Sequence, residues 1–295
     1  MQKEKVSIIV TCFNQEHCIE RSLQSISDQS YSHWECIIID DGSKDSSADT
    51  IKAYIDGDLR FKYVFQKNSG VAAARNKGFS LASGDYINFL DGDDTFKPKK
   101  LEKQIDCFIN DAKLDICICD HDHYIHNSNT VEYFKFTELK PDPIKQIIYD
   151  WQDGVAFPQH AVLYKRAVWD MQEKPYPTDY KGRSEDWIFN ITVALKGKQY
   201  FFLNKILCTY HHYGNNYTTE IFNSASSAIH AAFYINKKLP EEYQTDFIDH
   251  TIQKSMNRYL EDKKIKILQS SGNWRLGNII TRPFFTIKDK VKKWI

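Results

Sequence analysis

The nine residues Tyr86–Asp94 constrain the fold more than any other stretch, because an apolar run ends there in a group of acids. The apolar part, which ends at Leu90, predicts a buried strand of an α/β sheet. Asp91, Asp93 and Asp94 follow at the mouth of that strand. Carboxylates so close together repel one another in a low dielectric unless a cation or another partner is present. We therefore expect a divalent metal ion here.

The ligands that this turn offers are carboxylates only, with Gly92 between Asp91 and Asp93. Such a set suits a hard cation, Mg²⁺ or Mn²⁺, which keeps open positions for the phosphates of a substrate. An EF-hand loop is disfavoured, because it needs glycine where this chain has Phe96 and a helix where the chain has a strand. A solvated acidic turn stays open as an alternative for this motif taken alone.

Composition limits the classes of function that the chain can have. Its 295 residues carry 39 Lys+Arg and 39 Asp+Glu, so no overall basic field exists to attract nucleic acid. The seven cysteines include no Cys-x-x-Cys pair, which favours a reducing cytosol. No run of eighteen apolar residues exists to span a membrane. The sequence therefore predicts a globular cytoplasmic protein whose electrostatic function is local.

Strand-like and helical patterns alternate through the first ninety residues, which predicts a parallel sheet. Apolar runs at Val6–Thr11, Cys36–Ile39 and Phe61–Phe65 read as strands before the one at Tyr86. Ligands of such sheets lie beyond the carboxyl ends of the strands. We expect the polar segments that follow the strands to converge there: Thr11–Asn14, Asp40–Asp41, Asn68–Gly70 and Asp91–Asp94.

Five segments in this order resemble the inverting family 2 glycosyltransferases of GT-A fold. They are Val6–Asn14 (VSIIVTCFN), Asp40–Ser43 (DDGS), Asn68–Asn76 (NSGVAAARN), Leu90–Asp94 (LDGDD) and Glu185–Trp187 (EDW). The order is a strong signal, although an Asp-x-Asp alone is weak. The resemblance implies a mixed, mostly parallel sheet flanked by helices in a catalytic domain over residues 1–220. A helical C-terminal extension would follow over residues 221–295.

The resemblance also implies a nucleotide-sugar site at the strand ends. Asp41 would accept a hydrogen bond from a uracil imide or a ribose hydroxyl, although it could instead serve its own turn. Arg75 would hold a donor phosphate or pair with an aspartate. The other residues expected at the donor are Thr11, Phe13, Asn14, Glu16, Asn68, Gly70, Asp91 and Gly92.

Metal-binding and catalytic roles follow from the same resemblance. Asp93 is the favoured ligand of Mn²⁺ or Mg²⁺, with Asp91 and His211 as further candidates. Glu185 and Asp186 open a predicted helix, and Asp186 would be the general base that removes a proton from the acceptor. Acids are also common in a first helical turn because the helix dipole favours them, so a purely local role stays open.

Histidines gather in the less informative middle of the chain. His121, His123 and His126 invite a zinc site, but structural zinc sites show a tighter set of nitrogen and sulfur ligands. Surface or acceptor-pocket roles are favoured for them. His160 lies in a segment that resembles the family's acceptor-side strand, and we regard it as a candidate there.

The C-terminal residues form a basic amphipathic pattern, with five cations between Arg282 and Lys293 and apolar residues between them. Such a helix would lie on a membrane surface or dock on a partner. A solvated helix packed on the catalytic domain is an equal alternative. Peripheral attachment at the inner face of the membrane is therefore expected only through this tail.

These features predict a metal-dependent transferase of hexosyl or N-acetylhexosaminyl type. It would move a sugar, with inversion, from a nucleotide-diphosphate donor, UDP-linked in our prediction, to a hydroxyl of a glycan or lipid-linked glycan in surface polysaccharide or glycan synthesis. A nucleotidyltransferase is disfavoured, because no Gly-rich, Lys/Arg-bearing phosphate loop follows the first strand. A non-catalytic sugar-nucleotide-binding subunit is disfavoured by the presence of both Asp93 and Asp186.

Overall fold

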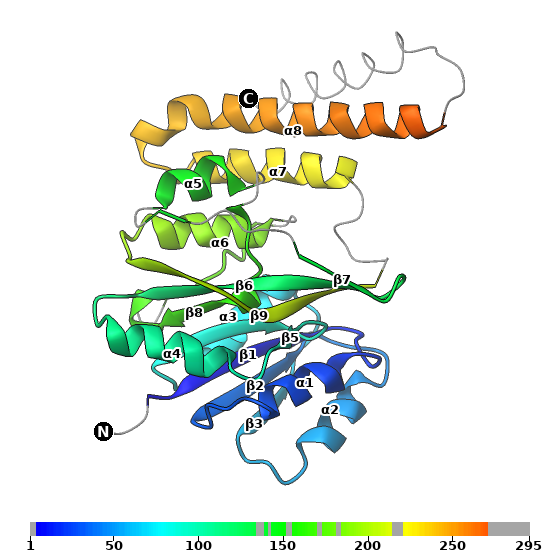
Figure 1. Ribbon diagram of the computed structural model, residues 1–295, viewed down its shortest axis with the longest axis vertical. Helices are drawn as coiled ribbons and strands as arrows, with labels where there is room; N and C mark the ends of the chain where they lie inside the picture. Colours follow the sequence, from blue (N-terminus) through cyan, green and yellow to red (C-terminus); the bar gives the residue numbers. More distant parts are fainter. Residues whose placement is uncertain are drawn as a thin grey trace. The chain divides into compact units, whose positions relative to one another are not determined.

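The computed structural model describes residues 4–133, 139–140, 143–151, 155–169, 173–180, 184–213 and 221–270 of the chain. The chain forms two compact units, Met1–Asn216 and Tyr217–Ile295. The first unit contains the sheet, and the described part of the second is helical (Figure 1). The basic helix expected between Arg282 and Lys293 lies outside the described residues, so the membrane contact stays a prediction.

The amino-terminal half of the sheet is parallel, as predicted. Its strands are β1 (Val6–Cys12), β2 (Trp34–Asp40), β3 (Phe61–Phe65) and β4 (Tyr86–Asp91), in the spatial order β3-β2-β1-β4. Every residue of β1 is buried, because helices cover both faces of a parallel sheet. In register, Thr11 is opposite Asp91 and Cys12 is opposite Asp40. The polar segments after these strands therefore leave the sheet at one edge.

Three helices cover this half of the sheet: α1 (Ile19–Ser27), α2 (Ser47–Ile55) and α3 (Val71–Leu81). In Figure 1, α1 and α2 lie in front of the strands and α3 lies behind them. The predicted helical face of α1 is confirmed, because Ile19, Leu23 and Ile26 are all buried. After α3 the chain returns to the sheet at β4, which pairs with β1.

The second half makes the sheet mixed, which confirms the predicted architecture. The short strand β8 lies antiparallel between β4 and β6, and β9 runs parallel to β6. The elements here are β5 (Thr95–Phe96), α4 (Lys100–Asn110), β6 (Ile116–Ile125), β7 (Thr130–Glu132), α5 (Ile144–Tyr149), η2 (Gln159–Ala161), β8 (Val162–Lys165), η3 (Arg166–Val168), α6 (Glu185–Ala194) and β9 (Tyr200–His212).

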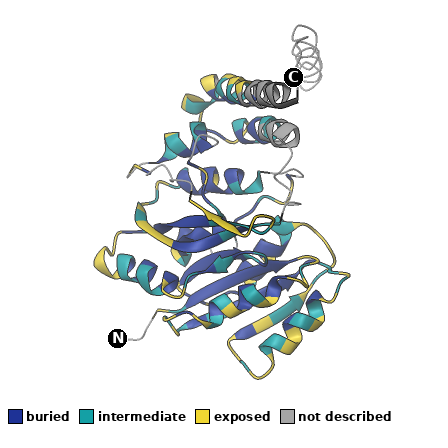
Figure 2. Cartoon of the chain, turned by 45° about the vertical axis from the view of Figure 1, so that its right-hand side comes forward, coloured by how far each residue is buried: buried dark blue, intermediate teal, exposed yellow. Residues whose placement is uncertain are grey.

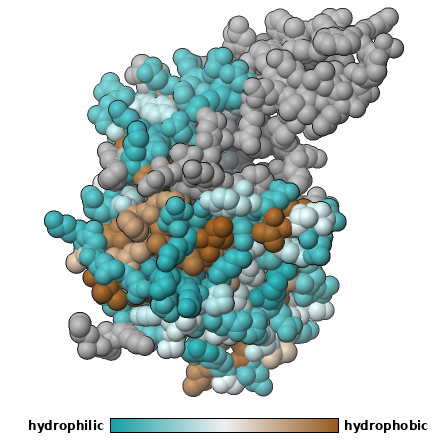
Figure 3. All heavy atoms as spheres, viewed as in Figure 1, coloured by the Kyte–Doolittle hydropathy of each residue, from teal (hydrophilic) through white to brown (hydrophobic). Residues whose placement is uncertain are grey.

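Burial changes along β9. Its first half is largely exposed and includes Phe201 and Ile206, whereas Leu207–Thr209 are buried (Figure 2). In Figure 3, hydrophobic residues gather in the band where Figure 1 draws β6, β7 and β9. The buried half of β9 is the part that pairs with β5, directly after the acidic turn.

Aromatic rings around Phe89 join the sheet to the helices behind the site. Phe89 lies on β4, and its ring makes edge-to-face contacts with Tyr164, Tyr176 and Phe189. Tyr176 and Phe189 stack with a centroid distance of 4.2 Å. Such pairs contribute about 0.5–1.5 kcal/mol each beyond the area that they bury. This cluster fixes α6, and with it Glu185 and Asp186, relative to β4.

The described part of the second unit is a pair of helices, α7 (Ile221–Asn236) and α8 (Glu241–Ser270), which pack against each other. Ala231, Ile235 and Phe247 are among its buried side chains. Of the helices in the described residues, none combines the length and the apolar character needed to cross a bilayer.

Close packing of α3 on β1 requires a glycine at position 78. A Cβ at Gly78 would lie 2.3 Å from Cγ2 of the buried Ile9. We expect Gly78→Ala to lower the free energy of unfolding by about 1–3 kcal/mol, because overpacking costs more than the helix propensity of alanine contributes. Urea denaturation measures the change. Lys77→Ala, an exposed change on the same helix, is the control and should stay within about 0.5 kcal/mol of wild type.

Candidate active site

The acidic turn after β4 packs tightly against β1 and α1. A Cβ at Gly92 would lie 2.9 Å from the carbonyl oxygen of Thr11 and 2.4 Å from Oε1 of Gln15, so only glycine fits. The Ser22 hydroxyl lies 2.7 Å from the carbonyl oxygen of Gly92 and 2.6 Å from that of Asp94. These contacts fix the backbone of the turn, so its carboxylates are held close together.

Arg75 connects the acidic turn to the Glu185–Asp186 pair. The guanidinium is buried and donates two hydrogen bonds to the carboxylate of Asp91, at 2.8 and 3.0 Å. Its other terminal nitrogen lies 3.3 Å from Oε1 of Glu185. Although burial alone would raise the pKa of Asp91, Arg75 holds that pKa below its usual value. Of the two roles left open for Arg75, the structure shows the pairing with aspartate.

The Asp93 carboxylate lacks such a partner. Within the described residues, no other side chain or amide donates a hydrogen bond to it. Burial, together with the charges of Asp94 and Asp91, raises the pKa of Asp93 to about 8. The carboxyl groups of the turn therefore exceed what nearby cations can compensate, so Asp93 is largely protonated at pH 7 without a metal; a divalent cation would favour its ionised form.

The donor set fits a hard cation that completes its coordination with substrate phosphates. Asp93 is half-buried and offers a carboxylate, the ligand type that Mg²⁺ and Mn²⁺ prefer. No group of three or more His, Cys, Asp or Glu side chains in the described residues could hold an ion unaided. A metal bound by one or two carboxylates would need the oxygens of a diphosphate and water.

His211 lies beside the turn, as its predicted metal role requires, but its ring is already engaged. Nε2 lies 3.0 Å from Oγ1 of Thr95, and Nδ1 lies 3.1 Å from Nε2 of His126. Burial, with the charge of Arg21, lowers the pKa of His211 to about 3, so the ring is neutral at pH 7. Metal binding would require one of these hydrogen bonds to break, and the role stays a prediction.

The expected nucleotide side of the site is assembled around Asp41. Its Oδ1 accepts hydrogen bonds from Nε2 of Gln66 and the amide of Ser69, at 2.7 and 2.9 Å, and its Oδ2 accepts from the amide of Gly70 at 2.8 Å. A Cβ at Gly42 would lie 2.7 Å from the amide nitrogen of Asn68. Asp41 therefore orders the loop Asn68–Gly70 against the end of β2, which is the local role that the sequence left open for it.

The segment after β1 lines the same edge. Asn14 adopts a left-handed backbone conformation with φ of 53°, and its side chain accepts a hydrogen bond from the amide of Lys44 at 2.8 Å. Glu16 accepts from the amide of Ser46 at 2.7 Å. Thr11 donates to Asp91 at 2.9 Å, and Phe13 is 46% exposed. Asn14 and Glu16 thus hold the loop after β2, while the ring of Phe13 is left accessible.

Asp186 lies in the first turn of α6, where its Oδ1 accepts a hydrogen bond from the amide of Trp187 at 2.8 Å. Burial and the neighbouring Glu185 raise the pKa of Asp186 to about 6. Such a carboxylate is ionised at pH 7 yet basic enough to accept a proton. Ser184 precedes the helix with φ of 79°, and its side chain makes no capping hydrogen bond.

Arg21 was not singled out from the sequence. It donates a hydrogen bond to the carbonyl oxygen of Asp93 at 2.7 Å and another to the hydroxyl of Tyr213. An arginine in a helix whose other face is buried looks like an ordinary surface residue, so no sequence signal separates it. The structure adds it to the residues that hold the acidic turn.

Comparison with known proteins identifies the family. The profile of glycosyl transferase family 2 matches residues 7–171, more than half of the chain. This chain belongs to glycosyltransferase family 2. The result confirms the resemblance found in the sequence and the predicted enzyme class, a transferase of sugars.

Relatives of this family 2 glycosyltransferase match it over different lengths. An uncharacterized glycosyltransferase of Nostoc sp. is 29% identical over 287 residues, which are 93% of this chain and 86% of that protein. The putative teichuronic acid biosynthesis glycosyltransferase TuaG and the putative glycosyltransferase EpsH of Bacillus subtilis are 45% and 38% identical, and the glycosyltransferase GlyA of Streptococcus pneumoniae is 28% identical. These three matches are shorter and cover 42%, 34% and 30% of the length of those proteins.

Solved structures confirm that the fold is of GT-A type. Residues 1–349 of TarS from S. aureus, in complex with UDP, superpose with a TM-score of 0.64 at 20% identity, covering 95% of this chain and 78% of that TarS fragment. The mannosyltransferase PcManGT from Pyrobaculum calidifontis, in complex with GDP-Man and Mn²⁺, superposes with a TM-score of 0.61 at 15% identity. That match covers 99% of this chain and 81% of PcManGT.

The histidines for which the sequence disfavours a zinc site, His121, His123 and His126, form no group of three or more possible metal ligands within the described residues. Nδ1 of His123 lies 2.7 Å from Nε2 of His212, and the two rings stack. His126 stacks on Tyr213 with a centroid distance of 4.0 Å. These rings line both faces of the β6–β9 pair beside the acidic turn, which suits the favoured acceptor-side role.

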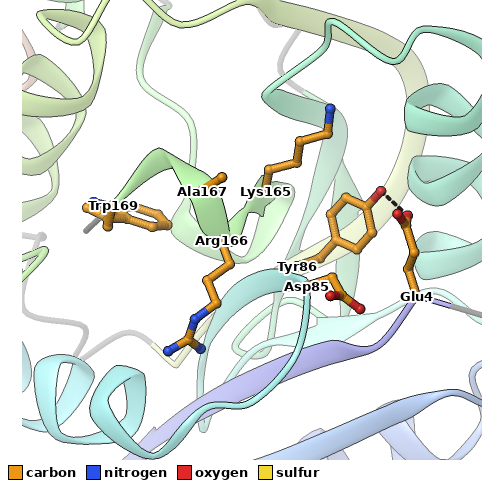
Figure 4. Close-up of a pocket in the computed structure, with 7 residues that line it drawn as sticks. All are labelled: Glu4, Asp85, Tyr86, Lys165, Arg166, Ala167 and Trp169. Carbon is orange, nitrogen blue, oxygen red and sulfur yellow. Dashed lines mark hydrogen bonds between the residues drawn. The ribbon is translucent and has the colours of Figure 1, made fainter. Parts of the chain in front are cut away.

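A cavity of about 420 Å³ lies at the opposite edge of the sheet of this glycosyltransferase (Figure 4). Asp85 and Tyr86 line it at the beginning of β4, with Lys165 and Arg166 at the end of the antiparallel β8. Tyr86 donates a hydrogen bond to Glu4 there, and Arg166 donates to the carbonyl oxygen of Ala82. None of the predicted site residues lines this cavity.

Replacement of Arg75 tests the connection between the two halves of the site. We expect Arg75→Met to lower the free energy of unfolding at pH 7 by about 3 kcal/mol, because Asp91 then loses its buried cation. The loss should shrink as the pH falls from 7, because burial without Arg75 raises the pKa of Asp91 and protonation in the variant removes the uncompensated charge. Urea denaturation at several pH values measures both effects. Lys77→Met, on the exposed side of α3, is the control; equal losses in both variants would contradict the interpretation.

Proposed function

We propose that this protein transfers a sugar from a nucleotide-diphosphate donor, UDP-linked, to an acceptor hydroxyl with inversion and with Mn²⁺ or Mg²⁺. The observation that carries the proposal is the Arg75 guanidinium, which contacts both Asp91 of the acidic turn and Glu185 of the Glu185–Asp186 pair. It brings a carboxylate cluster suited to a metal and a diphosphate next to a carboxylate suited to proton removal.

Asp186 is proposed as the general base. An inverting transfer is one displacement at the anomeric carbon, so it needs one group to remove the acceptor proton. With a pKa of about 6, Asp186 is ionised at pH 7 and can accept that proton. Glu185, next to Arg75, would orient the acceptor hydroxyl. When bound at Asp93, the metal would offset the charge that develops on the departing diphosphate.

Similar proteins support the choice of donor class. TarS has been solved with UDP and with UDP-GlcNAc, and PcManGT with GDP-Man and Mn²⁺. On this basis we propose a hexosyl- or N-acetylhexosaminyltransferase that acts on a glycan or a lipid-linked glycan. The pKa of Asp186, which suits proton transfer, favours an enzyme over a non-catalytic sugar-nucleotide-binding subunit.

A panel of nucleotide sugars tests this function directly. The protein is incubated with each donor and Mn²⁺ in the absence of acceptor, and the release of free nucleotide diphosphate is measured over hours. Slow hydrolysis of one donor would identify the substrate and support a glycosyltransferase. Release of inorganic pyrophosphate in the presence of a sugar phosphate and a nucleoside triphosphate would instead support the nucleotidyltransferase.

Asp93→Ala should remove the contribution of the metal to donor binding. Without this carboxylate, the diphosphate would face Asp91 with no bridging cation. Calorimetric titration of UDP with and without Mn²⁺ measures the effect, and the two affinities should become equal in the variant. Asp106→Ala, on the outer part of α4, should keep the wild-type difference. Full Mn²⁺-dependent affinity in Asp93→Ala would exclude this ligand assignment.

Asp186→Asn should keep donor and metal binding but lose about 10²–10⁴-fold in transfer rate, because it keeps the shape and removes the proton acceptor. In wild type the rate should rise with pH and level off above about 6, the pKa of Asp186, since only the ionised form accepts a proton. The residual rate of Asp186→Asn should lack this rise.

Glu185→Gln is the matched comparison, and its effect is expected in acceptor affinity more than in the rate at saturation. Both variants are measured at saturating donor and acceptor. If Glu185→Gln loses turnover and Asp186→Asn stays within a few-fold of wild type, the base is Glu185. A role for Asp186 in the helix dipole alone would change stability by only about 0.3–1 kcal/mol and leave turnover intact.

A further inference from the structure

The carboxylate of Asp94 is fully engaged by the protein itself. Its Oδ1 accepts a hydrogen bond from the backbone amide of His211 at 2.9 Å, and its Oδ2 lies 3.0 Å from Nδ1 of His160. The side chains of Asp94 and His160 are only 2% and 1% exposed. Asp94 therefore differs from Asp93, whose carboxylate no other described residue contacts through a hydrogen bond.

His160 is held firmly by the elements around it. It lies in η2, directly before β8, and Asn88 of β4 donates hydrogen bonds to its carbonyl oxygen and to that of Val162. Nε2 of Gln104, on α4, donates to the carbonyl oxygen of the adjacent Ala161 at 2.9 Å. The imidazole thus projects from a fixed part of the sheet interior and can hold a neighbouring group in place.

Burial of the His160–Asp94 pair costs folding free energy. Nε2 of His160 has no hydrogen-bond partner within the described residues. An unsatisfied buried polar atom costs about 1–3 kcal/mol, and buried polar pairs are often replaced by apolar side chains without loss of stability. Stability alone therefore does not account for a histidine and an aspartate here.

The His160–Asp94 pair acts on the backbone of the acidic turn. Asp94 follows Asp93 directly, and its amide closes the turn by donating to the carbonyl oxygen of Asp91 at 3.0 Å. The Asp94 side chain is therefore a further anchor of the backbone beside Asp93, in addition to Ser22 and Arg21. If Asp94 were released from His160, its carboxylate could rotate toward Asp93 and disturb the ligand.

We propose that His160 and Asp94 are positioning residues, which hold the turn so that Asp93 presents its carboxylate to the metal–diphosphate group of the donor. The proposal rests on the proposed function. It gives Asp94 no role as a ligand of metal or ribose, and it gives His160 a role on the metal side instead of contact with an acceptor.

The test compares His160→Leu with His160→Asn in full-length protein. Leucine removes the ring nitrogen that faces Asp94, whereas the side-chain amide of asparagine can occupy the place of Nδ1 and form a hydrogen bond to Asp94. UDP binding is measured by calorimetry across a range of Mn²⁺ concentrations, and unfolding is measured in parallel. His160→Leu should raise the Mn²⁺ concentration for half-maximal effect by about tenfold, as loss of a residue that orients a metal ligand does. UDP affinity without metal should not change.

Recovery of the Mn²⁺ response in His160→Asn would separate a positioning role of His160 from a general loss of stability. His160→Asn should recover most of the Mn²⁺ response, and His33→Leu, which changes a histidine beside Val6 at the end of β1 away from the acidic turn, should leave it unchanged. Wild-type Mn²⁺ response in His160→Leu would overturn the proposal. The proposal would also be overturned if His160→Leu and His160→Asn lost the Mn²⁺ response equally and in proportion to their loss of stability.

A second pair of variants keeps the test decisive if His160→Leu does not fold. Asp94→Asn can still accept from the amide of His211 and bond to His160, so it should bind Mn²⁺ better than Asp94→Leu does. If Asp94→Asn loses the metal response completely, as Asp93→Ala should, Asp94 is a ligand and the proposal is wrong. If wild type itself shows no Mn²⁺ response, the metal-dependent function fails and this proposal fails with it.

Discussion

The contact of one buried guanidinium with two carboxylates organises this protein. Arg75 is delivered by α3 from behind the sheet, Asp91 ends the next element, β4, and Glu185 begins α6, 110 residues after Arg75, so three elements meet at one cation. A guanidinium can satisfy two carboxylates because its donors form a planar fork. The proposed donor and acceptor sides are therefore joined electrostatically before any substrate binds.

The acidic turn holds more carboxyl groups than its neighbouring cations could compensate if all were ionised, and the surrounding fold keeps these groups in place. Thr11 and Arg75 satisfy Asp91, while His160 and the amide of His211 satisfy Asp94. The hydroxyl of Ser22 and the guanidinium of Arg21 hold the backbone carbonyl groups of the turn. Only Asp93 is kept without a hydrogen-bond partner from another described residue, and burial with the neighbouring acids raises the pKa of both Asp93 and Asp94, which is the electrostatic cost of the turn. A cation that binds there would convert that cost into affinity for a diphosphate.

Much of the amino-terminal half was predictable because its patterns are local and regular. Apolar runs marked β1, β2 and β4, the spacing of Ile19, Leu23 and Ile26 marked α1, and the βαβ alternation implied that the polar strand ends share one edge. The convergence of Thr11, Asp41 and Asp91 follows from this topology. The roles of individual residues were less accessible: Asp41 orders the loop Asn68–Gly70, and Arg75 pairs with two acids, neither of which periodicity reveals.

The sequence by itself determined the α/β architecture, the family and the edge of the sheet at which the chemistry-bearing side chains gather, because strand period, helix spacing and motif order are properties of neighbouring residues. Only the tertiary structure decided which acid is compensated and which is not. Arg21, His160 and Glu185 reach the acidic turn or Arg75 across separations of 66 to 110 residues. Such contacts depend on how β8, α6 and α1 pack around β4, and packing of side chains from distant segments leaves no periodic signal in a single sequence.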